Sequence, residues 1–314
     1  MIITQKFKKN IKKIIFSLSK KEIKSLIRRE RLKFSHKEIV DYVEIIFQHS
    51  QTQKTFKSIY KNSHLKITYS VFMKNIALFS RLFSYLFQFI NKKLSIKPSQ
   101  LLNMINSSLI AEKNSYYITQ KDWNLNRITT RIKFDEKIRI CGSKILVFLN
   151  RFKQIYHAEL IYINIPDMNI LKETSKYKSQ LKGIVLADKG FSHKIIRKRL
   201  SLDKNNIFDY GKAYCKLISP YRKSEKMNLN DKEKKLYKRR WKIETLFQNI
   251  KHHYSNHKLN LTGKYNQELK KAKFYSTLIS YNLSTGKILF YKRLLINRLP
   301  SATYPLFSFN LTCD

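Results

Sequence analysis

A single carboxylate stands among basic and polar side chains in residues 236–251. No Gly or Pro interrupts this segment, and at about 100° per residue Tyr237, Arg240, Glu244 and Lys251 fall on one stripe of a helix. Such a stripe suits phosphate chemistry, because Arg offers a bidentate fork, Lys a point charge and Tyr a stacking face. The plainer interpretation is a solvated helix face on which Glu244 balances its cationic neighbours.

A second carboxylate, Asp188, directly follows the apolar run 183–187 and precedes Gly190. An unpaired carboxylate at the end of a buried strand is costly, which favours a role as a metal ligand. The alternative is an Asp that caps the turn before Gly190. Hard Mg²⁺ takes carboxylate oxygens, so acids from a strand and a helix would suit it if they converged.

The spacing of the stripe resembles the signature of bacterial insertion-sequence transposases with an acidic-triad (DDE) domain. Tyr237, Arg240, Glu244 and Lys251 match that signature without a gap. The segments GSKILVFLN, IYINIPDMN and LADKGF also resemble strands of this family, and the resemblance covers roughly residues 35–285. It implies a ribonuclease-H-like mixed sheet flanked by helices, in an α/β (α+β) fold with an N-terminal all-helical region.

The resemblance also implies roles for individual residues. The catalytic and metal-binding set would hold two Mg²⁺ ions and consists of Asn106, Asp188 and Glu244. Tyr237, Arg240 and Lys251 would bind the phosphates of the element ends and the base next to the cut. The implied partners are element-end and target DNA, with a homodimer in the DNA complex.

Asn106 departs from the family pattern. The family has Ile-Asp-Ser in this strand, whereas this chain has Asn106 between Ile105 and Ser107. An amide offers one neutral oxygen and cannot supply the negative charge that holds two cations about 4 Å apart. The nearest acids, Glu112 and Asp122, lie beyond the strand. The sequence therefore predicts a protein that binds DNA but cleaves it very slowly or not at all.

Composition favours a polyanionic partner and a reducing compartment. Lys and Arg number 64 against 21 Asp and Glu, a net charge of +43, which points to nucleic acid. An AT-rich genome is an alternative source of the Lys excess. Three scattered cysteines favour a reducing cytoplasm, and a DNA partner would make the protein nucleoid-associated there. The most apolar segment, 75–91, contains Arg81 and is shorter than a span of about 20 residues, so we expect no membrane insertion.

Three parts are expected along the chain. Residues 1–97 show helical periodicity and many basic residues, which suits either a helical DNA-binding region or a helical cap on the next domain. Residues 98–290 form the transposase core, and 291–314 a C-terminal tail. Pro98 marks the first boundary.

Helices and strands alternate in the expected core. Asn230 and Glu233 are spaced as a capping box ahead of the helix that carries Glu244. The expected strands cover 101–110, 142–150, 155–164, 183–191 and 216–218, with a hairpin turn at 151–154. The strand at 183–191 ends in the acid Asp188 and a turn at Gly190. The expected helices cover 38–47, 52–60 and 70–90 before the core, and 169–179, 192–200, 236–251 and 266–284 within it.

The interpretation we favour is an insertion-sequence transposase that performs Mg²⁺-dependent cleavage and strand transfer of element-end DNA. Two alternatives stay open. One is a catalytically dead transposase remnant that binds DNA ends, and the other is a basic RNA-binding protein. If residues 106, 188 and 244 converge, the chain is a transposase or a remnant of one. If they do not converge, the RNA-binding alternative is favoured.

Overall fold

The structure is a computed structural model of the 314-residue chain. It describes residues 12–13, 15–51, 54–63, 65–111, 128–133, 136–162, 165–172, 177, 180–191, 215–220, 229–253 and 266–297. Within these ranges, side chains are described except at 51, 109–111, 128–142, 162, 168, 172, 249–253, 266 and 284–297. The expected helix at 192–200 lies outside the described residues.

The N-terminal region is helical, as expected. Its helices are α2 (Lys20–Ile27), α3 (His36–Gln51), α4 (Phe56–Lys61), α5 (Tyr69–Ser80) and α6 (Phe83–Lys93). Side-chain caps begin four of them, with Ser19, Ser35, Thr55 and Thr68 accepting from backbone N–H groups. The single helix expected at 70–90 is two helices. The break falls at Arg81, whose guanidinium donates to the carbonyl of Ile27.

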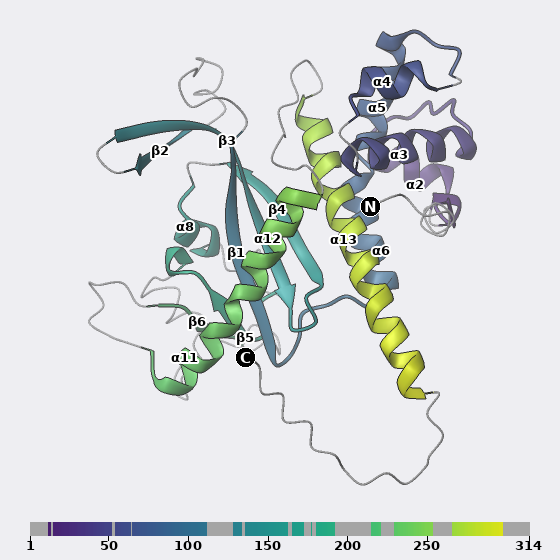
Figure 1. The fold of residues 1–314 in the computed structure, drawn as a ribbon. Coiled ribbons are helices and arrows are strands. Elements are labelled where there is room, and N and C mark those ends of the chain that lie inside the picture. The colour runs from purple at the N-terminus through teal and green to yellow at the C-terminus, as the bar shows by residue number, and fades with distance from the viewer. Residues whose placement is uncertain are drawn as a thin grey trace.

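A mixed sheet forms the second part of the molecule (Figure 1). Its strands are β1 (Leu102–Ala111), β2 (Ile128–Lys133), β3 (Glu136–Asn150), β4 (Ile155–Tyr162), β5 (Gly183–Ala187) and β6 (Cys215–Ile218). The order is β4-β3-β1-β5-β6, with β2 paired to the first part of β3. β3 is antiparallel to β1 and β4, whereas β5 and β6 run parallel to β1. The expected mixed sheet in an α/β fold, with an N-terminal helical region, is confirmed.

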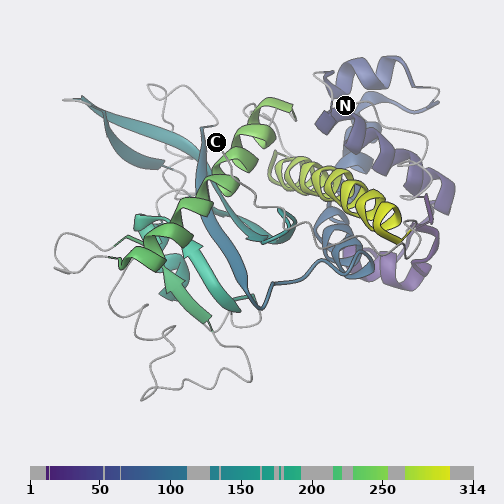
Figure 2. The same cartoon turned by 60° about the horizontal axis from the view of Figure 1, so that its bottom comes forward.

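Alternation along the strands gives the sheet two buried faces. Met104, Val147 and Leu186 lie on one face, in the core that also contains side chains of α12 (Trp241–His253). Figures 1 and 2 show α12 crossing this face. Ile105 and Ala187 lie on the other face, in the core that includes α8 (Asp167–Lys172).

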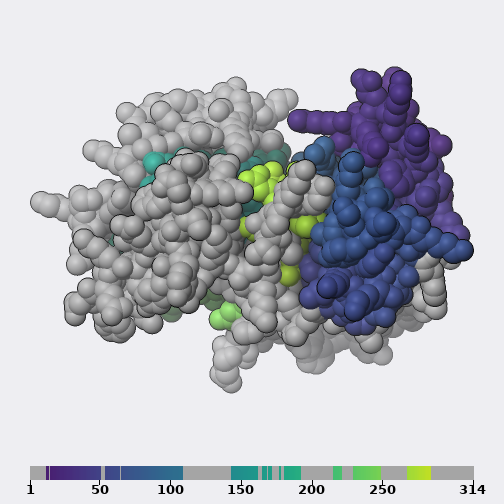
Figure 3. Space-filling model, turned by 90° about the horizontal axis from the view of Figure 1, so that it is seen from above, coloured from purple at the N-terminus to yellow at the C-terminus, as the bar shows by residue number. Residues whose placement is uncertain are grey.

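Helix α13 (Asn266–Asn297) joins the two parts of the molecule. It packs against α3, α5 and α6 and also touches β4. Figure 3 shows its first half, in yellow-green, between the N-terminal helices and the rest of the molecule. Sequence periodicity placed this helix in the core domain, but its main partners are helices of 1–97. It also runs through the boundary proposed at 290, so the three-part division stays a prediction.

Side chains from the helices satisfy the free edge of β4. Asn282 Oδ1 accepts from the Ile155 amide at 2.9 Å, and Asn282 Nδ2 donates to the Ile155 carbonyl at 2.6 Å and to Asn91 Oδ1 at 2.9 Å. The Asn91 amide also donates to the Ile155 carbonyl, and Tyr275 Oη to that of Ala158. An open strand edge is a site of unwanted pairing, and here two asparagines and a tyrosine close it.

Within the part of the chain that the structure describes, no helix is both long enough and apolar enough to cross a bilayer.

Candidate functional site

The signature segment is built from three short elements. Helix α11 (Asp231–Tyr237) is followed by the 3₁₀ turn η3 (Lys238–Arg240) and then by α12. The expected capping box is confirmed, because Asn230 and Glu233 exchange side-chain-to-backbone hydrogen bonds. The expected uninterrupted helix is wrong, since η3 tightens the backbone to about three residues per turn. Arg240 and Glu244 still meet across one turn.

Asn106 and Asp188 occupy neighbouring positions on adjacent parallel strands. The register of β1 and β5 pairs Ile105 with Ala187, and Asn106 and Asp188 are the next residue of each. Adjacent strands are about 4.8 Å apart. Because side chains alternate, both residues share the face of Met104 and Leu186, which is the face that α12 covers. This placement agrees with the geometry expected from the sequence.

Arg240 links the two carboxylates. Its Nη2 lies 3.8 Å from Asp188 Oδ1 and also contacts Glu244 Oε1. The arginine side chain is only 15% exposed, whereas those of Asp188 and Glu244 are 46% and 50% exposed. A carboxylate from a strand end and one from a helix therefore converge on a single guanidinium, on the face that also bears Asn106.

The aromatic ring of Tyr237 contacts this guanidinium. Arg240 Cζ lies 5.5 Å from the centre of the Tyr237 ring, within the range of a cation–π contact. Burial raises the pKa of the Tyr237 hydroxyl, and the positive charge of Arg240 opposes this increase. The phenol thus stays neutral, as an aromatic support for the arginine. Arg240 Nη1 is buried and has no hydrogen-bond partner among the described residues.

Lys251 lies in the second half of α12, and its side chain is outside the described residues. Glu112 and Asp122, the alternative first acids, also lie outside them. The structure therefore brings Asp188, Glu244, Arg240 and Tyr237 together around one charged centre. The roles of all six predicted residues remain predictions.

Sequence reasoning missed a polar cluster on the opposite face of the sheet. Asp167 Oδ1 accepts from Ser107 Oγ at 2.8 Å and from Lys144 Nζ at 2.9 Å. Lys144 also donates to the carbonyl of Ile165. Ser107 is the residue after Asn106, so the cluster braces β1 directly behind the candidate site. A lysine inside the apolar run of β3 was the only signal for this cluster in the sequence.

Gly190 brings the turn after Asp188 against the same cluster. A Cβ at position 190 would lie 2.6 Å from Asp167 Oδ2, closer than real Cβ contacts come. We expect Gly190→Ala to displace Asp167 and to lower the free energy of unfolding by about 1–3 kcal/mol, the usual range for overpacking.

The Gly190→Ala effect can be measured by urea denaturation. The matched control is Asp167→Ala with and without Gly190→Ala. If the clash with Asp167 is the cause, Gly190→Ala should cost much less in the Asp167→Ala background. Equal costs in both backgrounds would contradict this account.

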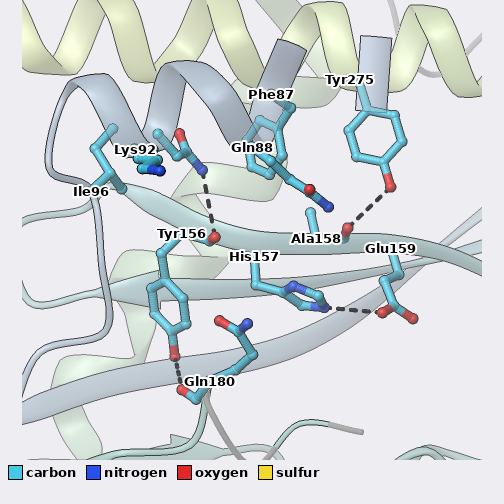
Figure 4. Close-up of a pocket in the computed structure, with 11 residues that line it drawn as sticks. Phe87, Gln88, Lys92, Ile96, Tyr156, His157, Ala158, Glu159, Gln180 and Tyr275 are labelled. Carbon is cyan, nitrogen blue, oxygen red and sulfur yellow. Dashed lines mark hydrogen bonds and ion pairs between the residues drawn. The ribbon is translucent and has the colours of Figure 1, made fainter. Parts of the chain in front are cut away.

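A separate cavity of about 420 Å³ lies between α6, β4 and α13 (Figure 4). His157 and Glu159 form a pair at 3.1 Å on its wall, and Tyr156 Oη donates to the Gln180 carbonyl. None of the predicted site residues lines this cavity. It belongs to the polar junction between the helices and the sheet edge.

Comparisons with known proteins give distant similarities only. No protein-family model and no curated protein matches the chain. Among solved structures, it is similar to the piggyBac transposase synaptic complex with hairpin DNA, at 12% identity over 95% of this chain and 83% of that chain, with a TM-score of 0.46. A pre-cleavage Mos1 transpososome has 9% identity over 89% of this chain and 98% of that chain, with a TM-score of 0.20. At these TM-scores, neither similarity supports a functional conclusion.

The donor chemistry of the site fits a divalent cation only in part. Asp188 and Glu244 offer the hard carboxylate oxygens that Mg²⁺ prefers, and Asn106 offers an amide oxygen. Among the described residues, no group of three Asp, Glu, His or Cys side chains is arranged to hold a metal ion. Two carboxylates suit one cation. A second cation beside it would be repelled, and position 106 lacks the negative charge that would offset this repulsion.

Proposed function

We propose that the chain is a transposase of the insertion-sequence type that binds element-end DNA and whose cleavage site has lost its first acid. The supporting observation is that Arg240 contacts both Asp188 and Glu244, two acids 56 residues apart in the chain. Asn106 and Asp188 each directly follow the paired residues Ile105 and Ala187 of β1 and β5. These are the three positions that the resemblance to DDE transposases assigns to the triad.

In this proposal, the chain's own residues bind and orient a DNA strand at the acids. Arg240 can exchange its carboxylate contacts for a phosphate, because its guanidinium is a planar fork of donors that matches phosphate oxygens. Tyr237 supports the fork, and Lys251 adds a point charge further along α12. The net charge of +43 supplies the long-range attraction to a polyanion.

Asp188 and Glu244 would hold Mg²⁺, which when bound polarises a phosphate for in-line attack. Because position 106 carries a neutral amide in place of a carboxylate, we expect the chain to bind element ends without cutting them. The remaining parts of the proposal are a second copy of the chain in the DNA complex and a DNA-binding role for the basic helices of 1–97.

Arg240 has two opposing effects in this proposal, and Arg240→Gln separates them. The substitution should weaken binding to duplexes carrying the inverted termini that flank the coding sequence, and it should lower the salt slope by about one unit. It should also tighten binding of Mn²⁺, used as a probe for Mg²⁺, because a positive charge leaves the two carboxylates.

Fluorescence anisotropy between 50 and 200 mM salt measures the DNA effect, and titration calorimetry with Mn²⁺ measures the metal effect. The control is Lys235→Gln, which removes one exposed charge from α11 away from both acids. An unchanged salt slope in Arg240→Gln would make the arginine a structural counter-ion. Failure of the unaltered protein to bind any DNA would refute the proposed function itself.

A further inference from the structure

A second surface next to the candidate site combines exposed aromatic rings with cations. It lies on the turn between β3 and β4 and at the start of α12, and we name it the ring–cation surface. Its members are Arg151, Phe152, Lys153, Arg239, Trp241 and Lys242. We propose that this surface binds unpaired nucleotides of the DNA strand that passes Asp188 and Glu244. This inference rests on the proposed function and specifies which form of DNA the site takes.

The β3–β4 turn is built rigidly, although it contains no glycine. Lys153 has a left-handed backbone with φ of 62°, which costs a non-glycine residue roughly 1–2 kcal/mol. Asn150 holds the turn, because its Oδ1 accepts from the amides of Phe152 and Gln154 at 3.0 and 3.1 Å. Tyr281 on α13 donates to the Lys153 carbonyl at 3.0 Å. The turn therefore holds the exposed residues Arg151, Phe152 and Lys153 in a fixed conformation.

Both aromatic rings of the surface face solvent. Trp241 is 53% exposed and Phe152 is 45% exposed. Arg151 Cζ lies 4.5 Å from the centre of the Phe152 ring, and Lys153 Nζ lies 5.5 Å from that of Trp241. Each ring thus offers a free face beside a cation. Stacking of bases on aromatic side chains combined with a basic groove is how proteins bind single strands.

The cations of this surface repel one another in the free protein. Lys242 is partly buried, and its pKa is lowered first by that burial and then by the charges of Lys153 and Arg239. Among the described residues, none of the four cations of the surface forms an ion pair with a carboxylate. A sugar–phosphate backbone would relieve this repulsion.

The position of the surface favours unpaired DNA over a duplex. Trp241 directly follows Arg240, and Glu244 lies one helical turn further along α12. A strand held at the acids therefore passes the rings within a few nucleotides. Bases of an intact duplex are stacked on each other and cannot reach a ring, whereas an unpaired base can.

Tryptophan fluorescence tests the proposal directly, because the chain has two tryptophans, Trp123 and Trp241. In a Trp123→Phe protein, the signal comes from Trp241 alone. We expect a ten-nucleotide oligothymidine, added in EDTA, to quench this signal. Trp241→Ala should weaken oligothymidine binding about 5- to 50-fold, whereas Trp241→Phe should retain most of it.

The control is Phe89→Ala, which removes a ring with Lys93 Nζ 5.4 Å from its centre but lies on α6, outside the ring–cation surface. Anisotropy measures the affinity for oligothymidine and for a matched duplex in every variant. Binding of the duplex should change less than twofold in Trp241→Ala. An equal loss for both ligands, or none for oligothymidine, would overturn the inference. Absence of all DNA binding by the unaltered chain would instead remove the proposed function.

Discussion

Replacing Asn106 by Asp should convert a protein that binds DNA without cutting it into one that nicks DNA in Mg²⁺. Asn106 is next to Asp188 across adjacent strands, on the sheet face that α12 covers. Two divalent ions 4 Å apart repel by about 4 kcal/mol even at the dielectric constant of bulk water. A third carboxylate between them offsets that repulsion, so we expect the nicking rate to rise at least about 100-fold.

The nicking experiment needs supercoiled plasmid carrying the element ends, purified protein and a Mg²⁺ titration. Asn106→Ala matches the substitution in position but adds no charge, and it should not restore nicking. Adding Glu244→Gln to the Asn106→Asp protein should abolish nicking again. Robust nicking by the unaltered chain that survives Asn106→Ala would show that another acid completes the site. Glu112 and Asp122 would then be the first candidates.

Periodicity was sufficient to predict the elements that carry the site. The apolar run before Asp188 predicted a buried strand, and β5 ends at Ala187, one residue before that carboxylate. Ile243, Leu246 and Phe247, which are spaced for one side of a helix, are buried in α12. These features can be predicted locally, because apolar residues recur at every second position on the buried face of a strand and at every third or fourth position on that of a helix.

The deviations within single elements have identifiable physical reasons. The 3₁₀ turn at Lys238–Arg240 was not predicted, because three basic residues contain no breaker and fit either helix type. β2 and the first six residues of β3, 136–141, were not among the expected strands. ITTRIK has only two apolar residues, Ile128 and Ile132, so its strand pattern is weak, whereas EKIRIC alternates isoleucines with charged residues and could have been recognised as a strand.

Long-range contacts could not be predicted from one sequence. Asp167 lies between an expected strand and an expected helix, and nothing in its local sequence shows that it binds Ser107 and Lys144, which are 60 and 23 residues away. The amphipathic pattern of α13 indicated a buried face without showing which helices cover it. Such pairings depend on tertiary packing, and no local pattern specifies them.

The largest effect on stability is expected at Asn282, at the junction of helices and sheet. Its side chain is fully buried and bonds both backbone groups of Ile155 and the side chain of Asn91. Asn282→Ala leaves the Ile155 amide and the Asn91 oxygen buried without these partners. At about 1–3 kcal/mol for each buried unsatisfied group, we expect the free energy of unfolding to fall by about 2–4 kcal/mol.

Urea denaturation followed by circular dichroism measures this loss as a shift of the midpoint at a constant slope. Tyr281→Phe is the matched control, because it removes one hydrogen bond from the neighbouring residue at an exposed site and should cost no more than about 1 kcal/mol. A lower slope or two separate transitions in Asn282→Ala would show that helices and sheet then unfold independently. Equal costs for the two variants would mean that the capped edge of β4 does not hold the two parts together.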